Sequence, residues 1–465
     1  MLPLIEDQLC QVEPDFDSIS RIPFYFGPKG KKLLGWLHIV KSKPVYDTGV
    51  VICQSLGVDY MNAYRPLRYA ADYSALAGIP AIRFDYHGTG DSSGLNEDGD
   101  RLESWLWSVE EAIRELKHLT DCSKIGLLGF RVGATFASII SERMELDFLV
   151  LWAACESGRR YMREIKTLQM SAQNQAEETE KKFIEAAGMV FVQETINAIE
   201  KINILQLTPK ALRVLLIPRD DLPENKKLKM AWESAGLNVQ QQTFPGYSNM
   251  VVDAHNVQIR HEALNKIISW VSESNLNSQD RIFDVTQLDK MMVATKMQHY
   301  NVYQEEGGRG SVFVTESIVT YGAGNKRIAI LTDPQSNESR SKPVIILSNS
   351  GANHRVGPNR LYVLLARELS RNGFQCLRID VDGLGDSVKS KPEGENVVYI
   401  NDSSNELHLA MQSFGDDYKA RKYIVMGLCS GSYFSFHAAL ELKDVNIVQC
   451  ILINPLTFYW EEGMS

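Results

Sequence analysis

Two G-x-x-x-G pentads place residues of very different chemistry at the centre of the same pattern. Residues 129–133 read GFRVG, with Arg131 at the centre, and residues 427–431 read GLCSG, with Cys429 at the centre. Each pentad follows a short apolar run and precedes a helical pattern, so we expect its central residue at a helix N-terminus. A thiol there gains thiolate character and can attack an acyl carbon. A guanidinium stays protonated at ordinary pH and cannot.

The pentads belong to two copies of one longer pattern. RFDYHGTGDS at 83–92 corresponds to RIDVDGLGDS at 378–387, which lies 295 residues further along the chain. VVICQSLG at 50–57 corresponds to VIILSNSG at 344–351, with a separation of 294. The pentads and the charged hairpins that precede each copy keep nearly the same separation. Such a long period excludes a solenoid and predicts two copies of one domain.

Short apolar strands alternate with helices in both copies. A helix over 65–78 in the first copy, and one over 360–373 in the second, each end at a Gly and lead into a second apolar run. This alternation predicts an α/β fold with a mostly parallel sheet covered by helices on both faces. Ligands bind at the carboxyl edge of such sheets.

The copies differ in length. We expect a first domain over 1–273 with an inserted helical cap at about 157–207, a connecting segment over 274–315, and a second domain over 316–465. After its pentad the second copy holds one helix and one strand. It lacks the cap, the later strand that ends in acids and the final His segment. We therefore expect a second domain that is incomplete at its C-terminus, either as a naturally shortened copy or because the chain is cut short. An exposed strand edge is expected there, and such an edge pairs readily with another chain.

The motifs R-x-D-x-x-G-x-G-D-S and G-x-x-x-G resemble the α/β-hydrolase superfamily, and most closely its serine-aminopeptidase-like and exosortase-associated branch. This resemblance covers almost the whole chain, twice. It implies tandem α/β-hydrolase-like domains in which each pentad is a nucleophile elbow. In the first copy it implies that Asp221, or Asp220, is the acid and that His255, which follows PGYSNMVVDA, is the general base. Arg131 then occupies the nucleophile position.

Arg131 has two interpretations. It could form an ion pair with Asp221 in a pocket that no longer has catalytic activity. Alternatively, Arg131 at a helix N-terminus could bind the carboxylate or phosphate of a ligand, because free N–H groups and the helix dipole favour anions there. In the second case Arg131 is a substrate-binding residue.

Cys429 is the best candidate nucleophile, although it could equally be an inert residue in a tight turn. Its oxyanion donors would be the N–H of Ser430 and the turn that contains Gly351 and Ala352. Ser430 itself is out of register as a nucleophile. No His follows the second pentad at the expected distance, so the base is open. His354 is the nearest local candidate.

A base could also come from the first copy. That copy has an acid and a base, Asp221 and His255, but no nucleophile, and the second copy has the reverse. If the two carboxyl edges face each other, His255 and Asp221 could serve Cys429, or another subunit could supply the base.

Charged residues also recur around both Gly-rich turns. Asp91 and Asp386, each followed by Ser, are expected to stabilise their turns through side-chain hydrogen bonds rather than to bind a metal. Arg83 and Asp85 alternate on one strand and so share a face, which predicts an internal ion pair, and the same spacing recurs in the second copy.

Composition excludes several other classes of protein. The chain has 465 residues, 44% of them hydrophobic and 23% charged, and a net charge of −9, which is typical of a globular protein and argues against nucleic acid as a partner. No apolar run is long enough for a membrane span, and the N-terminus lacks the basic region of a signal peptide. Seven scattered cysteines indicate reduced thiols in the cytoplasm. No metal ligand cluster is present, and acyl chemistry needs no cofactor.

Two functions therefore stay open. One is a hydrolase or acyltransferase that acts on a small-molecule ester, thioester or amide through Cys429. The other is a non-catalytic binding or scaffold protein with Arg131 in an anion-binding pocket. In either case a protein partner or a second copy of the chain could complete the short second domain.

Overall fold

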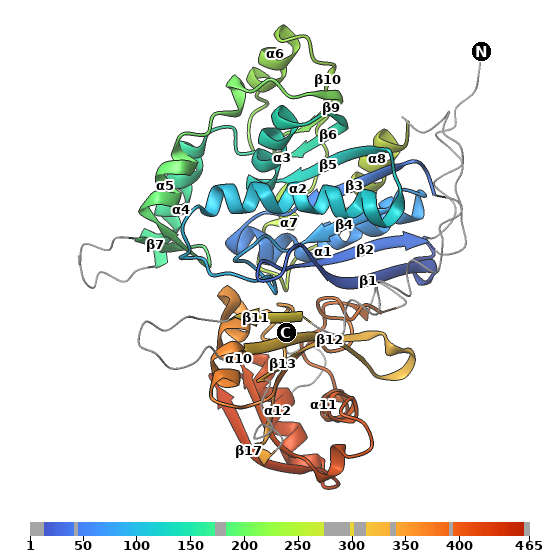
Figure 1. The fold of residues 1–465 in the computed structure, drawn as a ribbon, viewed down its shortest axis with the longest axis vertical. Coiled ribbons are helices and arrows are strands. Elements are labelled where there is room, and N and C mark those ends of the chain that lie inside the picture. The colour runs from blue at the N-terminus through green and yellow to red at the C-terminus, as the bar shows by residue number, and fades with distance from the viewer. Residues whose placement is uncertain are drawn as a thin grey trace.

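The computed structural model describes residues 14–40, 45–172, 183–273, 298–301, 313–334, 341–389 and 394–459. Two sheets, each flanked by helices, form two domains that lie one above the other in Figure 1. Most of the expected connecting segment over 274–315 lies outside the described residues. Its described parts, at 298–301 and from 313 onward, are strands of the second sheet.

The first sheet has eight strands, and all neighbours from β4 to β10 are parallel. Its spatial order is β1 (Ile19–Phe26), β2 (Leu33–Val40), β4 (Ala81–Phe84), β3 (Thr48–Cys53), β5 (Lys124–Phe130), β6 (Leu146–Trp152), β9 (Ala211–Ile217) and β10 (Val239–Gln241). The antiparallel pair β1–β2 joins the sheet through β4. This mostly parallel sheet agrees with the expected α/β fold.

Helices cover both faces of the first sheet. They are α1 (Gly57–Leu76), α2 (Arg101–Thr120), α3 (Val132–Arg143), α6 (Lys227–Ser234), α7 (Tyr247–Met250) and α8 (His261–Ser272). Along β3 the side chains alternate between two apolar clusters: Val51 packs with Trp105 of α2, and Val50 packs with Leu67 of α1. Burial on both faces explains why these strands are apolar runs without polar alternation.

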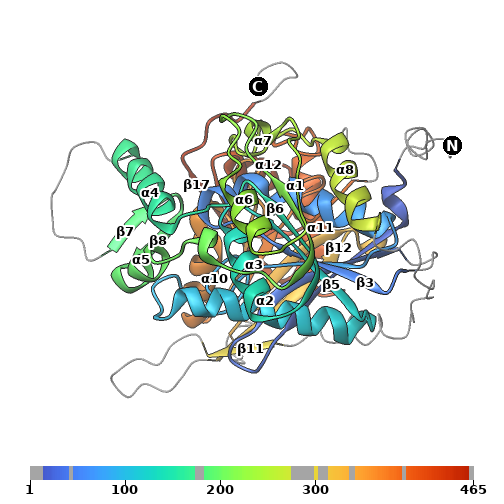
Figure 2. The same cartoon turned by 90° about the horizontal axis from the view of Figure 1, so that it is seen from above.

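An inserted segment lies between β6 and β9. It consists of α4 (Gly158–Ala172), the hairpin β7 (Phe183–Ala186) and β8 (Met189–Val192), α5 (Gln193–Glu200) and a short 3-10 turn (Ile204–Gln206). Figure 2 places α4, α5 and β7 together at one side of the first domain. The expectation of a wholly helical cap missed the hairpin. In this hairpin, exposed and buried side chains alternate over 183–186. Ala187 and Gly188 follow, and their positive φ angles of 52° and 76° suit a tight hairpin turn.

The second sheet has seven strands and repeats the order of the first. The order is β11 (Gln298–Asn301), β12 (Phe313–Tyr321), β13 (Arg327–Asp333), β15 (Cys376–Ile379), β14 (Val344–Leu347), β16 (Lys422–Leu428) and β17 (Asn446–Ile453). Its helices are α10 (Leu361–Arg371), α11 (Ser403–Gln412) and α12 (Ser430–Glu441). From β12 onward each strand has a counterpart in the first sheet, up to β17, which corresponds to β6.

The two sheets differ at that last strand. β6 is covered on its outer edge by β9, whereas β17 is an edge strand of the sheet formed by the described residues. Most residues of β17 are therefore partly or fully exposed, and Val448 keeps 47% of its surface accessible. No helix among the described residues is long and apolar enough to cross a membrane.

Candidate active site

Both pentads fold into the same sharp turn. Arg131 has φ 54° and ψ −124°, and Cys429 has φ 57° and ψ −118°. Each is the N-cap of the following helix, α3 or α12. Each donates its backbone N–H to the neighbouring strand, Arg131 to the Trp152 carbonyl and Cys429 to the Ile453 carbonyl, both at 2.9 Å. A positive φ is strained at a residue other than glycine, and both residues adopt it in a sharp turn between a strand and a helix, which we call the elbow.

The flanking glycines make this turn possible. A Cβ added at Gly133 would lie 2.1 Å from the carbonyl oxygen of Gln54. A Cβ added at Gly427 would lie 2.0 Å from the backbone of Gly431. Neither clash can be relieved by moving a flexible side chain, because both involve backbone atoms. The pentad pattern is therefore explained by close backbone packing at both elbows.

Arg131 is held by two carboxylates. Its Nε donates to Asp59 at 2.9 Å and its Nη2 donates to Glu164 of α4 at 2.5 Å. The expected partner, Asp221, instead accepts two hydrogen bonds from Arg219, at 2.9 and 2.7 Å. These hydrogen bonds lower the pKa of Asp221. The expectation of an Arg131–Asp221 ion pair is thus wrong in its partner, because the inserted helix α4 brings Glu164 to the guanidinium.

The neighbouring acid has a structural role. Asp220 accepts hydrogen bonds from the backbone N–H groups of Gly246 and Tyr247, at 2.7 and 3.2 Å. The turn above the first elbow is also occupied, since Val58 N–H donates to the carbonyl of Ala187 at the tip of the β7–β8 hairpin, at 2.6 Å. The N–H that could stabilise an oxyanion in the first domain therefore already has a partner.

The second elbow is more open. Cys429 is a free, half-buried cysteine, and two tyrosines lie close to it. Burial raises the pKa of Tyr362 to about 12, and the nearby charge of Cys429 adds to this rise. The same two causes raise the pKa of Tyr399. The Tyr362 hydroxyl accepts a hydrogen bond from Leu428 N–H at 3.0 Å, which fixes the strand that leads into the elbow.

The expected oxyanion residues are brought together only in part. Gly351 N–H donates to the Ser430 hydroxyl at 2.8 Å, so these two residues meet beside Cys429. That hydrogen bond occupies the Gly351 donor. Ala352 N–H has no hydrogen bond to the described residues, and it follows Gly351 in the same turn.

His255 reaches from the first domain to this turn of the second. A Cβ added at Gly351 would lie 2.7 Å from His255 Cε1 and 2.8 Å from Nε2, so the imidazole packs directly on the Gly351 backbone. Asn396 of the second domain fixes the same segment by donating to the carbonyls of Ala254 and His255, at 2.9 and 3.1 Å. His255 is exposed. Among the described residues it makes no hydrogen bond to a carboxylate.

His354 lies in the interface between the domains. Its ring stacks on Tyr64 of α1, with centroids 3.9 Å apart, and its Nε2 lies 3.0 Å from the Tyr60 hydroxyl. It is 2% exposed. Burial, and then the charge of Arg355, lower the pKa of His354 to about 3. This imidazole is neutral and packed against the first domain.

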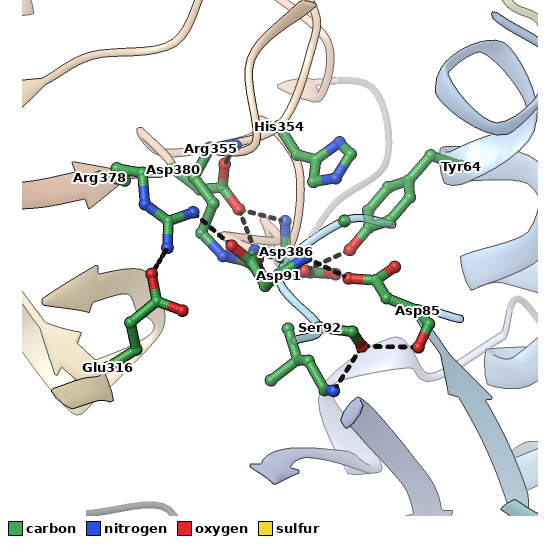
Figure 3. A network of polar contacts seen from close by, with 12 residues as sticks. Tyr64, Asp85, Asp91, Ser92, Glu316, His354, Arg355, Arg378, Asp380 and Asp386 are labelled. Atoms are coloured by element: carbon green, nitrogen blue, oxygen red, sulfur yellow. Dashed lines mark hydrogen bonds and ion pairs between the residues drawn. The ribbon is translucent and has the colours of Figure 1, made fainter. Parts of the chain in front are cut away.

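The interface holds an ion-pair network in which the two copies exchange partners (Figure 3). Arg83 of the first domain pairs with Asp386 of the second, and Arg378 of the second pairs with Asp91 of the first. The expected internal pair of Arg83 with Asp85 does not form. Strand β4 ends at Phe84, before Asp85, and the opposite domain supplies the carboxylate that pairs with Arg83.

Arg355 joins the exchanged pairs. Its guanidinium lies 2.8 Å from Asp91, 2.8 Å from Asp380 and 2.7 Å from Asp386, all fully buried. Buried charges of this kind need several partners to offset their loss of hydration. Neither Asp91 nor Asp386 therefore acts mainly as a local turn residue. Their following serines do, since Ser92 donates to the Asp85 carbonyl at 2.6 Å and accepts from Leu34 N–H.

Further contacts fix the two Gly-rich elements across the interface. Arg360 donates to the carbonyls of Gly88, Gly90, Ser92 and Gly94 in the Gly-rich turn of the first domain. A small apolar cluster of Tyr25, Leu34, Ile318 and Ile330 packs β1 and β2 against β12 and β13. The domains are thus joined by polar and apolar contacts. The sequence patterns did not point to Arg355 or Arg360. The only indication of a role was their position in the segment after β14, at the carboxyl edge of the sheet.

No family model and no curated protein matches the sequence. Among solved structures, the esterase Est1E from Butyrivibrio proteoclasticus with ferulic acid bound is 17% identical, with a TM-score of 0.43, over 54% of this chain and 98% of that one. A proline iminopeptidase from Mycobacterium smegmatis is 12% identical, with a TM-score of 0.39, over 56% of this chain and 99% of that one. A lidless serine hydrolase from Xanthomonas campestris is 12% identical, with a TM-score of 0.38, over 56% and 97%.

These scores and identities are low, so the fold rests on the strand order and the elbows described above. About half of this chain covers nearly all of each solved chain. No group of three or more His, Cys, Asp or Glu residues that could hold a metal ion is found in the part of the chain that the structure describes.

Proposed function

We propose that the chain cleaves or transfers acyl groups at a composite site, with Cys429 of the second domain as nucleophile and His255 of the first as general base. The observation that carries this proposal is the packing of the His255 imidazole on Gly351, whose N–H bonds Ser430, the residue next to Cys429. The first domain supplies a base without a nucleophile, and the second supplies a nucleophile without a base.

One property of Cys429 supports its role. Its side chain is partly accessible, unlike Cys53 and Cys376, which are fully buried. Burial raises the pKa of Cys376 to about 12, which leaves that thiol protonated and inert.

The reaction would have two steps. His255 takes the Sγ proton of Cys429 as the sulfur attacks the acyl carbon; a C–S bond forms, the bond to the leaving oxygen or sulfur breaks, and the leaving group takes the proton from His255. Water then attacks the thioester and gives a proton to His255. The C–S bond breaks, the acid leaves, and Cys429 recovers the proton. The developing oxyanion would accept hydrogen bonds from Ser430 N–H and Ala352 N–H, neither of which has a partner among the described residues.

We expect the substrate to be a small acyl ester or thioester, and the cytoplasm is the compartment that keeps such a thiol reduced. Asp221 takes no part in this scheme, because Arg219 holds it. His354 takes no part either, because it is sealed between the domains. His255 therefore acts without a carboxylate partner.

The test compares turnover of short-chain p-nitrophenyl esters and thioesters in four variants. Cys429→Ala should abolish turnover and labelling of the native protein by iodoacetamide at this position, read by mass spectrometry. His255→Gln should lower turnover by about 10²–10⁴-fold, the usual contribution of a general base. Cys450→Ala, on the neighbouring strand β17, and His437→Gln, on helix α12, are the matched controls and should leave turnover unchanged.

Two results would contradict the proposal. Full turnover in His255→Gln, together with none in Cys429→Ala, would show that the base is not shared between the domains. No turnover of any ester and no labelling of Cys429 in the native chain would favour the second candidate, a non-catalytic binding protein. The pocket around Arg131 favours that candidate and is described next.

A further inference from the structure

The first domain contains a cavity beside its elbow. Its volume is about 240 Å³, far more than one water molecule needs. It lies at the carboxyl ends of β6 and β9, beneath α4 of the inserted segment. Arg131, which stands at the first elbow in place of a nucleophile, lines it.

Arg131 is positioned as a fixed cation. The residue is 5% exposed, and Asp59 and Glu164 fix two of its three guanidinium nitrogens. Its Nη1 makes no hydrogen bond among the described residues. The two partners differ: Asp59 comes from α1, whereas Glu164 lies on α4 with 44% of its side chain exposed. An anion entering the cavity would compete with Glu164 for the guanidinium.

A second guanidinium lines the same cavity. Arg219 donates two hydrogen bonds to Asp221 and lies over the Tyr247 ring, 4.7 Å from its centroid. An arginine that is ordered before binding loses less side-chain entropy when it meets a ligand. Arg160 adds a third cation at the rim, and two glutamates, Glu156 and Glu164, also line the cavity.

The remaining wall is apolar. Leu151, Leu216 and Leu228 line the cavity and are almost fully buried. A cavity with cations at one part of its wall and leucines at another fits an amphipathic anion. The lining holds three arginines and two glutamates, and Asp59 and Asp221 already pair with two of these arginines, so the cavity has no surplus of positive charge. A ligand with one negative charge suits this balance better than a doubly charged phosphate.

We infer that the first domain binds a monocarboxylate with a short apolar tail, its carboxylate on the Arg131 guanidinium and its tail against the leucines. Binding forms no covalent bond and does not depend on Cys429, so it can be tested whether or not the second domain is an enzyme. The site is separate from the proposed acyl-transfer site and lies at the other elbow.

The test is isothermal titration calorimetry of the full chain with hexanoate, hexanamide and hexyl phosphate. Hexanoate should bind, and its neutral isostere hexanamide should bind at least about tenfold more weakly, because a charge-assisted hydrogen bond is lost. Arg131→Met should abolish hexanoate binding. Arg143→Met, which changes an exposed arginine at the other end of α3, is the control and should leave binding unchanged.

Glu164→Gln distinguishes a binding role from a structural one. It removes the carboxylate that competes for Arg131, so hexanoate affinity should rise several-fold, and a purely structural ion pair predicts no such gain. Equal binding of hexanoate and hexanamide, no binding of hexanoate, or no gain in Glu164→Gln would overturn the inference. Tighter binding of hexyl phosphate than of hexanoate would overturn the choice of a monocarboxylate.

Discussion

The two elbows share a backbone and differ in the one side chain that could do chemistry. The φ angles of Arg131 and Cys429 agree within a few degrees, and both residues bond the next strand at the same distance. The backbone is set by the flanking glycines and by close packing, so the central side chain can change without loss of the turn. The shape of an elbow is therefore no evidence of a nucleophile, and each domain has to be judged by its own central residue.

The interface repeats this comparison at a larger scale. Arg83 with Asp386, and Arg378 with Asp91, are equivalent pairs exchanged between the domains. An exchange of equivalent residues is what a two-fold dimer interface shows, because each contact occurs twice. The symmetry is incomplete, and one clear difference is that Arg355 of the second domain corresponds to Tyr60 of the first, 295 residues earlier.

This difference between Arg355 and Tyr60 predicts the largest effect on the free energy of unfolding. Arg355 bonds three buried carboxylates, whereas Tyr60 donates to Asp85 alone, at 2.7 Å. Arg355→Met should lower the free energy of unfolding by about 3–5 kcal/mol, because it leaves buried charges without a partner. Tyr60→Phe should cost less, about 1–3 kcal/mol. Urea unfolding followed by circular dichroism measures both.

The control for Arg355 is Arg371→Met, which removes an exposed pair with Glu368 at the end of α10. It should change the free energy of unfolding by less than about 1 kcal/mol. If Arg355→Met lowers the free energy of unfolding as little as Arg371→Met does, the network does not hold the domains together. The comparison with a dimer interface would then have no energetic support.

The second prediction concerns the elbows. A Cβ added at Gly133 would lie 2.1 Å from a carbonyl oxygen, but one added at Gly431 would lie 2.8 Å from its nearest atom, the Asn349 carbonyl oxygen. Gly133→Ala should therefore destabilise by up to about 3 kcal/mol, and Gly431→Ala by about 1 kcal/mol. Thermal unfolding of both variants compares them. A larger loss in Gly431→Ala would mean that the second elbow is the more tightly packed of the two.

Much of this architecture could be predicted from the sequence, because local patterns encode it. The landmarks repeated about 295 residues apart gave the two domains, and the pentads gave the two elbows with Arg131 and Cys429 at their centres. The alternation of apolar runs and helices predicted a mostly parallel sheet covered by helices, but not the order of its strands. The hairpin in the inserted segment was missed because a polar segment was judged by its helical spacing alone.

The partners of charged side chains could not be predicted in this way. The spacing of Arg83 and Asp85 predicted an internal ion pair, yet the carboxylate that pairs with Arg83 comes from residue 386. Glu164 similarly displaces Asp221 as a partner of Arg131. Such pairings depend on how whole domains dock, and no local periodicity contains that information. The same holds for His255, whose position against Gly351 needs both domains.

The third prediction uses the pH dependence of the interface. The pKa of His354 is lowered from 6.5 to about 3, mainly by burial, so between these values the folded protein binds fewer protons than the unfolded chain. Stability contributed by the neutral ring is complete above pH 6.5 and falls as the pH decreases. Between pH 7 and pH 5 wild type should lose about 2 kcal/mol more than His354→Gln. Urea unfolding at both pH values measures the difference, and equal losses would mean that His354 ionises freely when folded.

The smallest effect is expected at Asp221, the residue that the family resemblance assigned as the acid. It is exposed and bonded to Arg219, so Asp221→Asn should destabilise by less than about 1 kcal/mol. It should leave ester turnover at Cys429 unchanged, because Arg219 holds Asp221, whereas the proposed base His255 packs against Gly351. A turnover assay beside His255→Gln checks this. Equal losses in the two variants would mean that Asp221 and His255 still act as an acid–base pair. The first domain would then supply both residues to Cys429 of the second domain.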